Sequence, residues 1–235
     1  MGRYLYYFLM PRIARVVAVD YPHHITQRGN NKAVVFFDDE DRLYYCETLT
    51  KFSKKYQLEI WAYCLMGNHI HLLAVPRKTD SLAKGIGLTN LVYTQYLNRK
   101  LNNSGRVWQN RFFSCLINRD EYLWAVARYI EMNPVKAGLV NNPGEYFWSS
   151  AQPHLDGRKD EILSKEEWLM PDDRQRYSEF ILQSAEEIEK AIRRNTSTGK
   201  PLANEEFLAS MKEKIGVRLT KDEIGRPRKN REVSP

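Results

Sequence analysis

Two apolar, β-prone runs lie within residues 59–75 and are joined at Met66-Gly67-Asn68, a sequence with turn character. This pattern predicts a β-hairpin. Side chains two residues apart in a strand point to the same face, so His69 and His71 stand side by side in the second run, about 7 Å apart along the strand. The apolar residues that alternate with them face the other way. The hairpin therefore presents a pair of imidazoles on one face of a sheet.

Helical periodicity and short β-prone runs alternate through the first two thirds of the chain. Apolar stripes predict helices over residues 38–56, 81–98 and 121–132, and strands are predicted over residues 22–28 and within residues 105–117. The order is strand, helix, hairpin, helix, strand, helix. We therefore expect an α+β fold of ferredoxin-like type, in which an antiparallel sheet centred on the hairpin has the helices packed on one face.

The character of the sequence changes after about residue 165. Residues 174–194 read as one long amphipathic helix, residues 195–201 as a linker and residues 205–215 as a second helix, before a polar, basic end. We expect that end to be disordered. The chain then divides into an extension outside the core, a main domain, and a helical extension with a disordered basic tail, over residues 1–10, 11–165 and 166–235.

Composition narrows the class of protein. The chain has 235 residues, 43% of them hydrophobic, and a formal net charge of +7, which fits a globular protein with a polyanionic partner. No apolar run approaches the roughly 18 residues of a membrane span, so we expect no membrane partner. The three cysteines are widely spaced and form no CxxC pair, which favours reduced cysteines in a cytoplasmic protein.

The histidine pair of the hairpin is a candidate metal site, because paired imidazoles on one face suit a metal ion. A bare His-x-His is more often a hydrogen-bonded pair in the core, and two ligands need a third. His23 and His24 of the first strand compete as ligands, and His24 shares a polar face with Thr26 and Arg28. These residues alone leave the ligand set open.

A nucleophile is harder to find, because no Ser-His-Asp or reactive-cysteine pattern is visible. Tyr129 lies one helical turn before Asn133, in a helix that we expect to end at Pro134. A free tyrosine has a pKa near 10, so only about 0.1% is ionised at pH 7, a deficit near 4 kcal/mol. A divalent ion beside a phosphodiester would offset part of that cost by withdrawing charge from the scissile group.

Residues 64–73, Cys-Leu-Met-Gly-Asn-His-Ile-His-Leu-Leu, resemble the histidine-hydrophobe-histidine (HUH) strand of the REP-associated tyrosine transposases, which belong with the small single-tyrosine insertion-sequence transposases. Gly67 stands where that family often has proline. The resemblance covers about residues 11–165, and further motifs follow in family order at residues 22–30, 105–112, 128–140 and 148–150.

The resemblance implies an enzyme that cleaves and rejoins single-stranded DNA at hairpins of extragenic palindromic repeats. Tyr129 matches the nucleophile, which becomes joined to a 5′-phosphate and frees a 3′-hydroxyl. His69 and His71 match metal ligands for Mg²⁺ or Mn²⁺, and Asn133 matches the third ligand. The protein is then expected in the bacterial cytoplasm, associated with the nucleoid, as a monomer or homodimer.

Basic and aromatic residues outside this set are candidates for DNA contacts, since arginine beside an aromatic ring suits single strands. They are Arg12, Arg28, Trp108, Arg111, Arg226 and Arg228. Two alternatives stay open: a non-catalytic protein that retains the fold to bind DNA hairpins, and a metal-dependent phosphoesterase that uses water. A covalent DNA adduct on Tyr129 separates both from the transposase.

Overall fold

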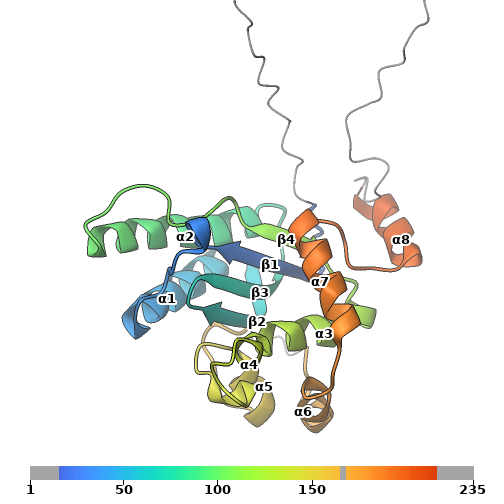
Figure 1. Ribbon diagram of the computed structural model, residues 1–235. Helices are drawn as coiled ribbons and strands as arrows, with labels where there is room; N and C mark the ends of the chain where they lie inside the picture. The colour runs from blue at the N-terminus through green and yellow to red at the C-terminus, as the bar shows by residue number, and fades with distance from the viewer. Residues whose placement is uncertain (1–15, 165–167, 216–235) are drawn as a thin grey trace, which may run out of the picture.

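The computed structural model describes residues 16–164 and 168–215 (Figure 1). Four strands, β1 (His23–Arg28), β2 (Leu58–Met66), β3 (His69–Pro76) and β4 (Phe113–Leu116), form one sheet in the order β2-β3-β1-β4. Every neighbouring pair is antiparallel. The strand order and the intervening helices are those of a ferredoxin-like sheet, so the predicted α+β class and the predicted hairpin are confirmed.

Helices α1 (Asp39–Lys55) and α2 (Ser81–Lys100) pack side by side on one face of the sheet, as predicted (Figure 1). The side chain of Asp38 begins α1 by accepting a hydrogen bond of 3.0 Å from the backbone N–H of Asp41. The apolar residues that alternate with the histidines of β3 point into this layer, where Ile70 and Leu72 are fully buried.

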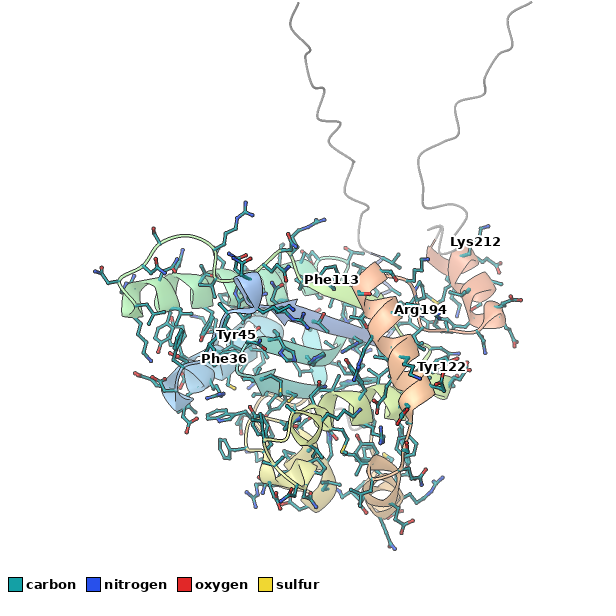
Figure 2. All side chains as sticks on the ribbon, in the orientation of Figure 1. Phe36, Tyr45, Phe113, Tyr122, Arg194 and Lys212 are labelled. Carbon is teal, nitrogen blue, oxygen red and sulfur yellow. The ribbon has the colours of Figure 1, made fainter. Side chains whose placement is uncertain are left out.

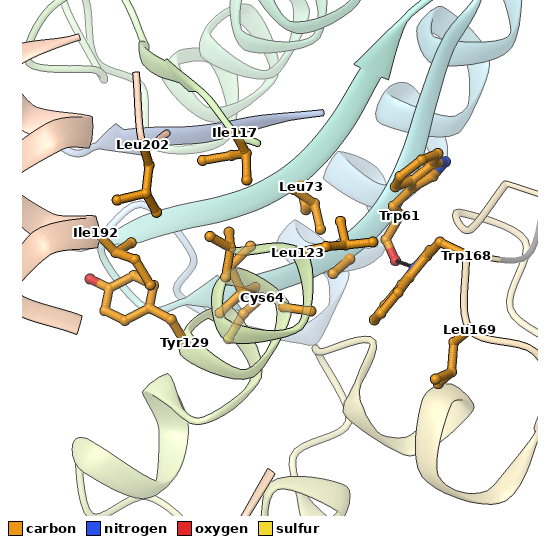
Figure 3. Packing of buried hydrophobic residues seen from close by; sticks show 14 of the residues in the cluster. Trp61, Cys64, Leu73, Ile117, Leu123, Tyr129, Trp168, Leu169, Ile192 and Leu202 are labelled. Carbon is orange, nitrogen blue, oxygen red and sulfur yellow. Dashed lines mark hydrogen bonds between the residues drawn. The ribbon is translucent and has the colours of Figure 1, made fainter. Parts of the chain in front are cut away.

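The opposite face is also covered by helices, so the helices do not lie on one face alone. There α3 (Arg119–Glu131) packs against β2 and β3, and α7 (Glu186–Thr198) packs against α3 and β4 (Figures 1 and 3). Helices are needed on both faces because β2 and β3 are buried on both faces for almost their whole length. Near-continuous apolar runs of this kind need cover on two sides.

The C-terminal part departs from the predicted single helix over residues 174–194. The structure has two helices, α6 (Arg174–Ile181) and α7, separated by residues 182–185. The guanidinium of Arg128 on α3 donates a hydrogen bond to the Gln183 carbonyl and so satisfies the backbone at this turn.

The expected linker over residues 195–201 is also wrong in part. Residues 195–198 complete α7, which ends at Gly199 with a left-handed φ of +70°. The chain then returns to the sheet, where Leu202 forms a parallel bridge with Ile117. The second predicted helix is confirmed as α8 (Glu205–Ile215), and the Asn204 side chain accepts from the Phe207 N–H at 2.9 Å. The remaining short helices are α4 (Asn133–Lys136), α5 (Ala151–Asp156), η1 (Asn30–Lys32), η2 (Pro143–Glu145) and η3 (Pro171–Asp173).

Candidate active site

A cleft of about 680 Å³ opens where β1 and β3 meet α3 and α7. Figure 2 shows Arg194 on α7 and Phe113 on β4, two of the residues along its rim. The cleft brings together the predicted nucleophile, the predicted metal ligands and residues of the C-terminal extension. The residues that concern its chemistry are His24, Thr26, Gln27, Arg28, His69, His71, Gln109, Tyr129, Asn133, Arg193, Arg194, Thr196 and Ser197.

The two histidines of β3 share one face, as their spacing predicts. Their ring centroids are 5.0 Å apart with the planes at 81°. In the antiparallel register His71 lies opposite Thr26, and His69 lies opposite Arg28. Residues directly opposite in a sheet have side chains on the same face, so the polar side of β1 and the histidine pair form one surface.

The hydrogen bonds of His69 define which of its nitrogens is free. Its Nδ1 lies 2.6 Å from the Asn68 side-chain oxygen, which can only accept, so Nδ1 carries the proton and Nε2 presents a lone pair. Burial, with a smaller contribution from the charge of Arg28, lowers the pKa of His69 to about 4. Burial, followed by the neighbouring histidines, also holds the pKa of His71 well below its usual range. Both rings are therefore neutral at pH 7, the form that binds metal.

The other two candidate histidines do not join this pair as ligands. His24 lies behind His71, with its Nε2 3.1 Å from His71 Nδ1 and its Nδ1 2.7 Å from the Thr196 hydroxyl. The ring of His23 is bonded to the backbone on both sides: Nδ1 to the Tyr21 carbonyl at 2.8 Å, and Nε2 to the Ala18 N–H at 3.3 Å. Neither residue presents a free ring nitrogen.

Tyr129 projects from α3 into the cleft and is 6% exposed. Its ring meets those of His71 and His24 edge to face, with centroids 5.6 Å away in both cases. Burial raises the pKa of Tyr129, while a hydrogen bond from the Arg193 guanidinium and the charge of Arg28 offset part of that rise. The phenol is therefore held neutral beside cations that would stabilise its ionised form.

Asn133 lies one turn beyond Tyr129, where the chain changes from α3 to α4. Its side-chain nitrogen donates to the carbonyls of Tyr129 at 2.6 Å and Ile130 at 3.2 Å, which directs the amide oxygen away from the helix end. The helix ends just before Pro134, as predicted. α3 stops at Glu131, and the proline enters the first turn of α4, where no backbone N–H is needed.

The site can accommodate a divalent cation. His69 and His71 each offer a neutral imidazole and Asn133 offers an amide oxygen, which makes three donors and leaves positions for a substrate. Over residues 16–164 and 168–215 no group of three or more His, Cys, Asp or Glu residues could hold a metal ion, so the amide is needed to complete a set of three. Neutral ligands would leave the full charge of the ion for a phosphate.

Buried polar contacts fix the position of the helix that carries Tyr129. Arg128 forms an ion pair of 2.6 Å with Glu189 of α7. Glu131 is fully buried and accepts hydrogen bonds from Ser150 at 2.6 Å and Tyr177 at 2.7 Å, and contacts His154 Nδ1 at 2.5 Å. The residues on either side of the nucleophile are thus tied to different parts of the C-terminal extension.

Sequence reasoning missed the role of α7, although the signal was present. Arg193 lies in the segment predicted as a long amphipathic helix, whereas Thr196 lies in the segment predicted as a linker. The apolar Ile192 of α7 packs beside Tyr129 in the core of this face (Figure 3). The amphipathic pattern predicts that α7 packs against another part of the protein, but it does not indicate which part of the sheet α7 covers.

The predicted DNA contacts have different positions. Arg28 lines the cleft, and Arg111 lines an adjoining cleft of about 450 Å³. Trp108 lies mainly in the core, where it packs against Phe36, Tyr45 and Tyr93 and donates to the Asn90 carbonyl at 3.2 Å. It also lines the cleft of Arg111, so its contact with DNA stays a prediction. The three remaining candidates, Arg12, Arg226 and Arg228, lie outside the described residues, as do residues 1–10.

Comparison with known proteins identifies the family. Residues 18–133 match the family of IS200-like transposases. This range is just under half of the chain. The resemblance to REP-associated tyrosine transposases is confirmed by a Haemophilus influenzae protein of that name, 28% identical over 148 residues, which are 56% of this chain and 84% of the relative.

A solved structure supports the fold of this chain. A REP-associated tyrosine transposase bound to a REP hairpin matches with a TM-score of 0.52 and 16% identity, over 67% of this chain and 93% of the other. The matched family range ends at residue 133, so α7 with Arg193 and Thr196 lies beyond it. No helix within the described part of the chain is long and apolar enough to cross a membrane.

Proposed function

We propose that this chain is a metal-dependent transposase and endonuclease that cleaves and rejoins single-stranded DNA at hairpin sequences, through a covalent link between Tyr129 and a 5′-phosphate. The observation that carries the proposal is the meeting of Tyr129 and His71 at 5.6 Å between ring centroids, with Asn133 one turn further on. A tyrosine at the end of a cleft with three metal donors has the parts that phosphodiester attack requires.

His69, His71 and Asn133 would hold Mg²⁺ or Mn²⁺, in line with the usual preference of imidazole for transition metals and of oxygen for Mg²⁺. When bound, the ion would withdraw charge from the scissile phosphate. The protein supplies ligands whose protonation is already correct, since both rings are neutral at pH 7.

The residues around Tyr129 then account for the covalent step. The phenolic oxygen attacks phosphorus and loses its proton, the bond from phosphorus to the 3′-oxygen breaks, and that oxygen takes up a proton to become a 3′-hydroxyl. Arg193 holds the phenol by a hydrogen bond and favours its ionised form, and the charge of Arg28 acts in the same direction. Rejoining is the reverse reaction with a new 3′-hydroxyl.

The cleft favours an extended strand over a duplex. Because Tyr129 is only 6% exposed, a phosphate must enter the cleft to reach it, and the backbone of a stiff base-paired helix cannot bend into the cleft as a single strand can. The relative of similar fold was solved with a REP hairpin, which supports hairpin DNA with single-stranded flanks as the substrate of this chain.

The test is covalent capture of a labelled hairpin oligonucleotide with single-stranded flanks. Wild-type protein with Mn²⁺ should yield a DNA adduct that survives denaturant and maps to the peptide containing Tyr129. Tyr129→Phe should keep the fold and the hairpin affinity while losing adduct and cleavage, and Tyr122→Phe on the same helix is the matched control. Cleavage without an adduct would support a phosphoesterase that uses water, and tight binding with neither would support a non-catalytic hairpin-binding protein.

A further inference from the structure

A line of hydrogen bonds runs from the hydroxyl of Thr196 on α7 to the histidine pair. That hydroxyl lies 2.7 Å from His24 Nδ1, and His24 Nε2 lies 3.1 Å from His71 Nδ1.

The three side chains in this line are buried, so water cannot replace one of the links. His24 is 1% exposed, Thr196 is 3% exposed and His71 is 6% exposed. The two imidazole planes are within 8° of each other and the centroids are 5.3 Å apart, as expected for rings placed edge to edge and joined by one nearly linear hydrogen bond. Buried polar groups of this kind keep their partners because losing one is costly.

The proposed role of His71 as a metal ligand gives the direction of every proton in the line. A ligand nitrogen needs a free lone pair, so His71 would bind metal through Nε2, the nitrogen that faces away from His24, and carry its proton on Nδ1. His71 Nδ1–H then donates to His24 Nε2, and His24 Nδ1–H donates to the Thr196 oxygen.

We propose that Thr196 and His24 are positioning residues that fix the tautomer and orientation of His71, and that α7 thereby completes the histidine pair from behind. This inference rests on the proposed function for the identity of His71 as a metal ligand. A histidine that donates its second N–H to a fixed acceptor is a more basic and better oriented ligand, and loss of such an acceptor commonly weakens metal binding.

Thr196→Val tests the line, because it removes the hydroxyl and keeps the shape of the side chain. Thr196→Ser restores the hydroxyl. Thr198→Val is the matched control, since Thr198 lies on the same helix and its hydroxyl donates only to α7 carbonyls, at 2.9 and 3.2 Å. Two readouts are used: Mn²⁺ affinity from electron paramagnetic resonance, and the tautomer of His71 in metal-free protein from two-bond ¹H–¹⁵N spectra.

We expect wild-type protein to hold His71 as the Nδ1–H tautomer without metal. Thr196→Val should give a mixture of tautomers and weaken Mn²⁺ binding by about tenfold or more, while Thr196→Ser and Thr198→Val stay close to wild type. An unchanged tautomer and affinity in Thr196→Val, or equal losses in Thr196→Val and Thr198→Val, would overturn the inference. If His71→Ala left Mn²⁺ affinity unchanged, the ligand assignment itself would fail, and the metal-free spectra would still decide whether Thr196 sets the tautomer.

Discussion

Replacing Arg193 with glutamine removes the cation that is hydrogen-bonded to Tyr129 and leaves a neutral side chain of similar length. Arg193 lies on α7, with its guanidinium carbon 5.8 Å from the centre of the tyrosine ring. Its hydrogen bond is the largest of the interactions that oppose the effect of burial on the pKa of Tyr129. In the variant, the pKa of the phenol should rise further, because burial persists while the opposing charge is lost.

The size of the effect follows from the kind of hydrogen bond that is lost. A hydrogen bond to a charged group contributes roughly 1.5–3 kcal/mol to stability. If that full amount stabilises the developing phenolate, cleavage should slow by roughly 10- to 100-fold, at about 1.4 kcal/mol per factor of ten. The direction of the pH shift follows from the raised pKa of the phenol. The phenol ionises at higher pH in the variant, so the rising limb of the plot of cleavage rate against pH should move to higher pH.

Single-turnover cleavage with excess protein measures this step apart from DNA binding, and a pH series gives the position of the rising limb. Lys190→Gln is the matched control, because Lys190 is an exposed cation on the same helix that pairs with Glu187 at 2.6 Å. It removes the same charge without contact to Tyr129. A rate profile for Arg193→Gln that falls uniformly, with its rising limb unmoved, would refute the role given to this arginine.

Three further outcomes are expected. His71→Ala should abolish cleavage with Mg²⁺ or Mn²⁺ yet leave hairpin binding largely intact, with equal or better wild-type activity in Mn²⁺; wild-type cleavage by the variant at limiting metal would contradict this. Glu131→Ala should lower the urea unfolding free energy by roughly 3–5 kcal/mol, because it strands buried donors, whereas Glu187→Ala on the surface should change it little. Burial lowers the pKa of His23 to about 4 and that of His24 to about 3, so the unfolded chain takes up protons at these residues before the folded chain does as pH falls below about 6.5. The unfolding free energy should therefore drop by roughly 2 kcal/mol for each histidine between pH 7 and pH 5. Equal unfolding free energies at the two pH values would refute this prediction.

The parts of the site that the sequence predicts are those governed by local periodicity. A period of two places His69 and His71 on one face of β3, and a helical turn places Asn133 after Tyr129. Both relations hold, and α3 ends before Pro134 as expected. The proline lies in the first turn of α4, where its missing N–H is not needed.

The parts that could not be predicted depend on contacts between residues far apart in the chain. Thr196 and His24 are separated by 172 residues, and nothing in the local pattern of either segment specifies the other. The same reasoning explains Trp108, which lies beside arginines in the sequence and therefore suggested a stacking platform. In the fold its ring fills the core between α1 and α2, because the surrounding aromatic residues come from other segments.

The charge distribution of the cleft explains why α7 belongs to the site. Within the described residues, the lining of the cleft contains arginines but no carboxylate. The nearby carboxylate of Glu189 is paired with Arg128 and Lys136. An anionic phosphate therefore meets neutral histidines, a neutral amide and the cations of Arg28 and Arg193. The two histidines, the amide and Arg28 come from the matched family range, but Arg193 and the hydroxyl that holds His24 come from α7. A chain that ended at residue 133 would retain the histidine pair, His24, Tyr129 and Asn133, yet it would lose both the cation beside the phenol and the hydroxyl that holds His24.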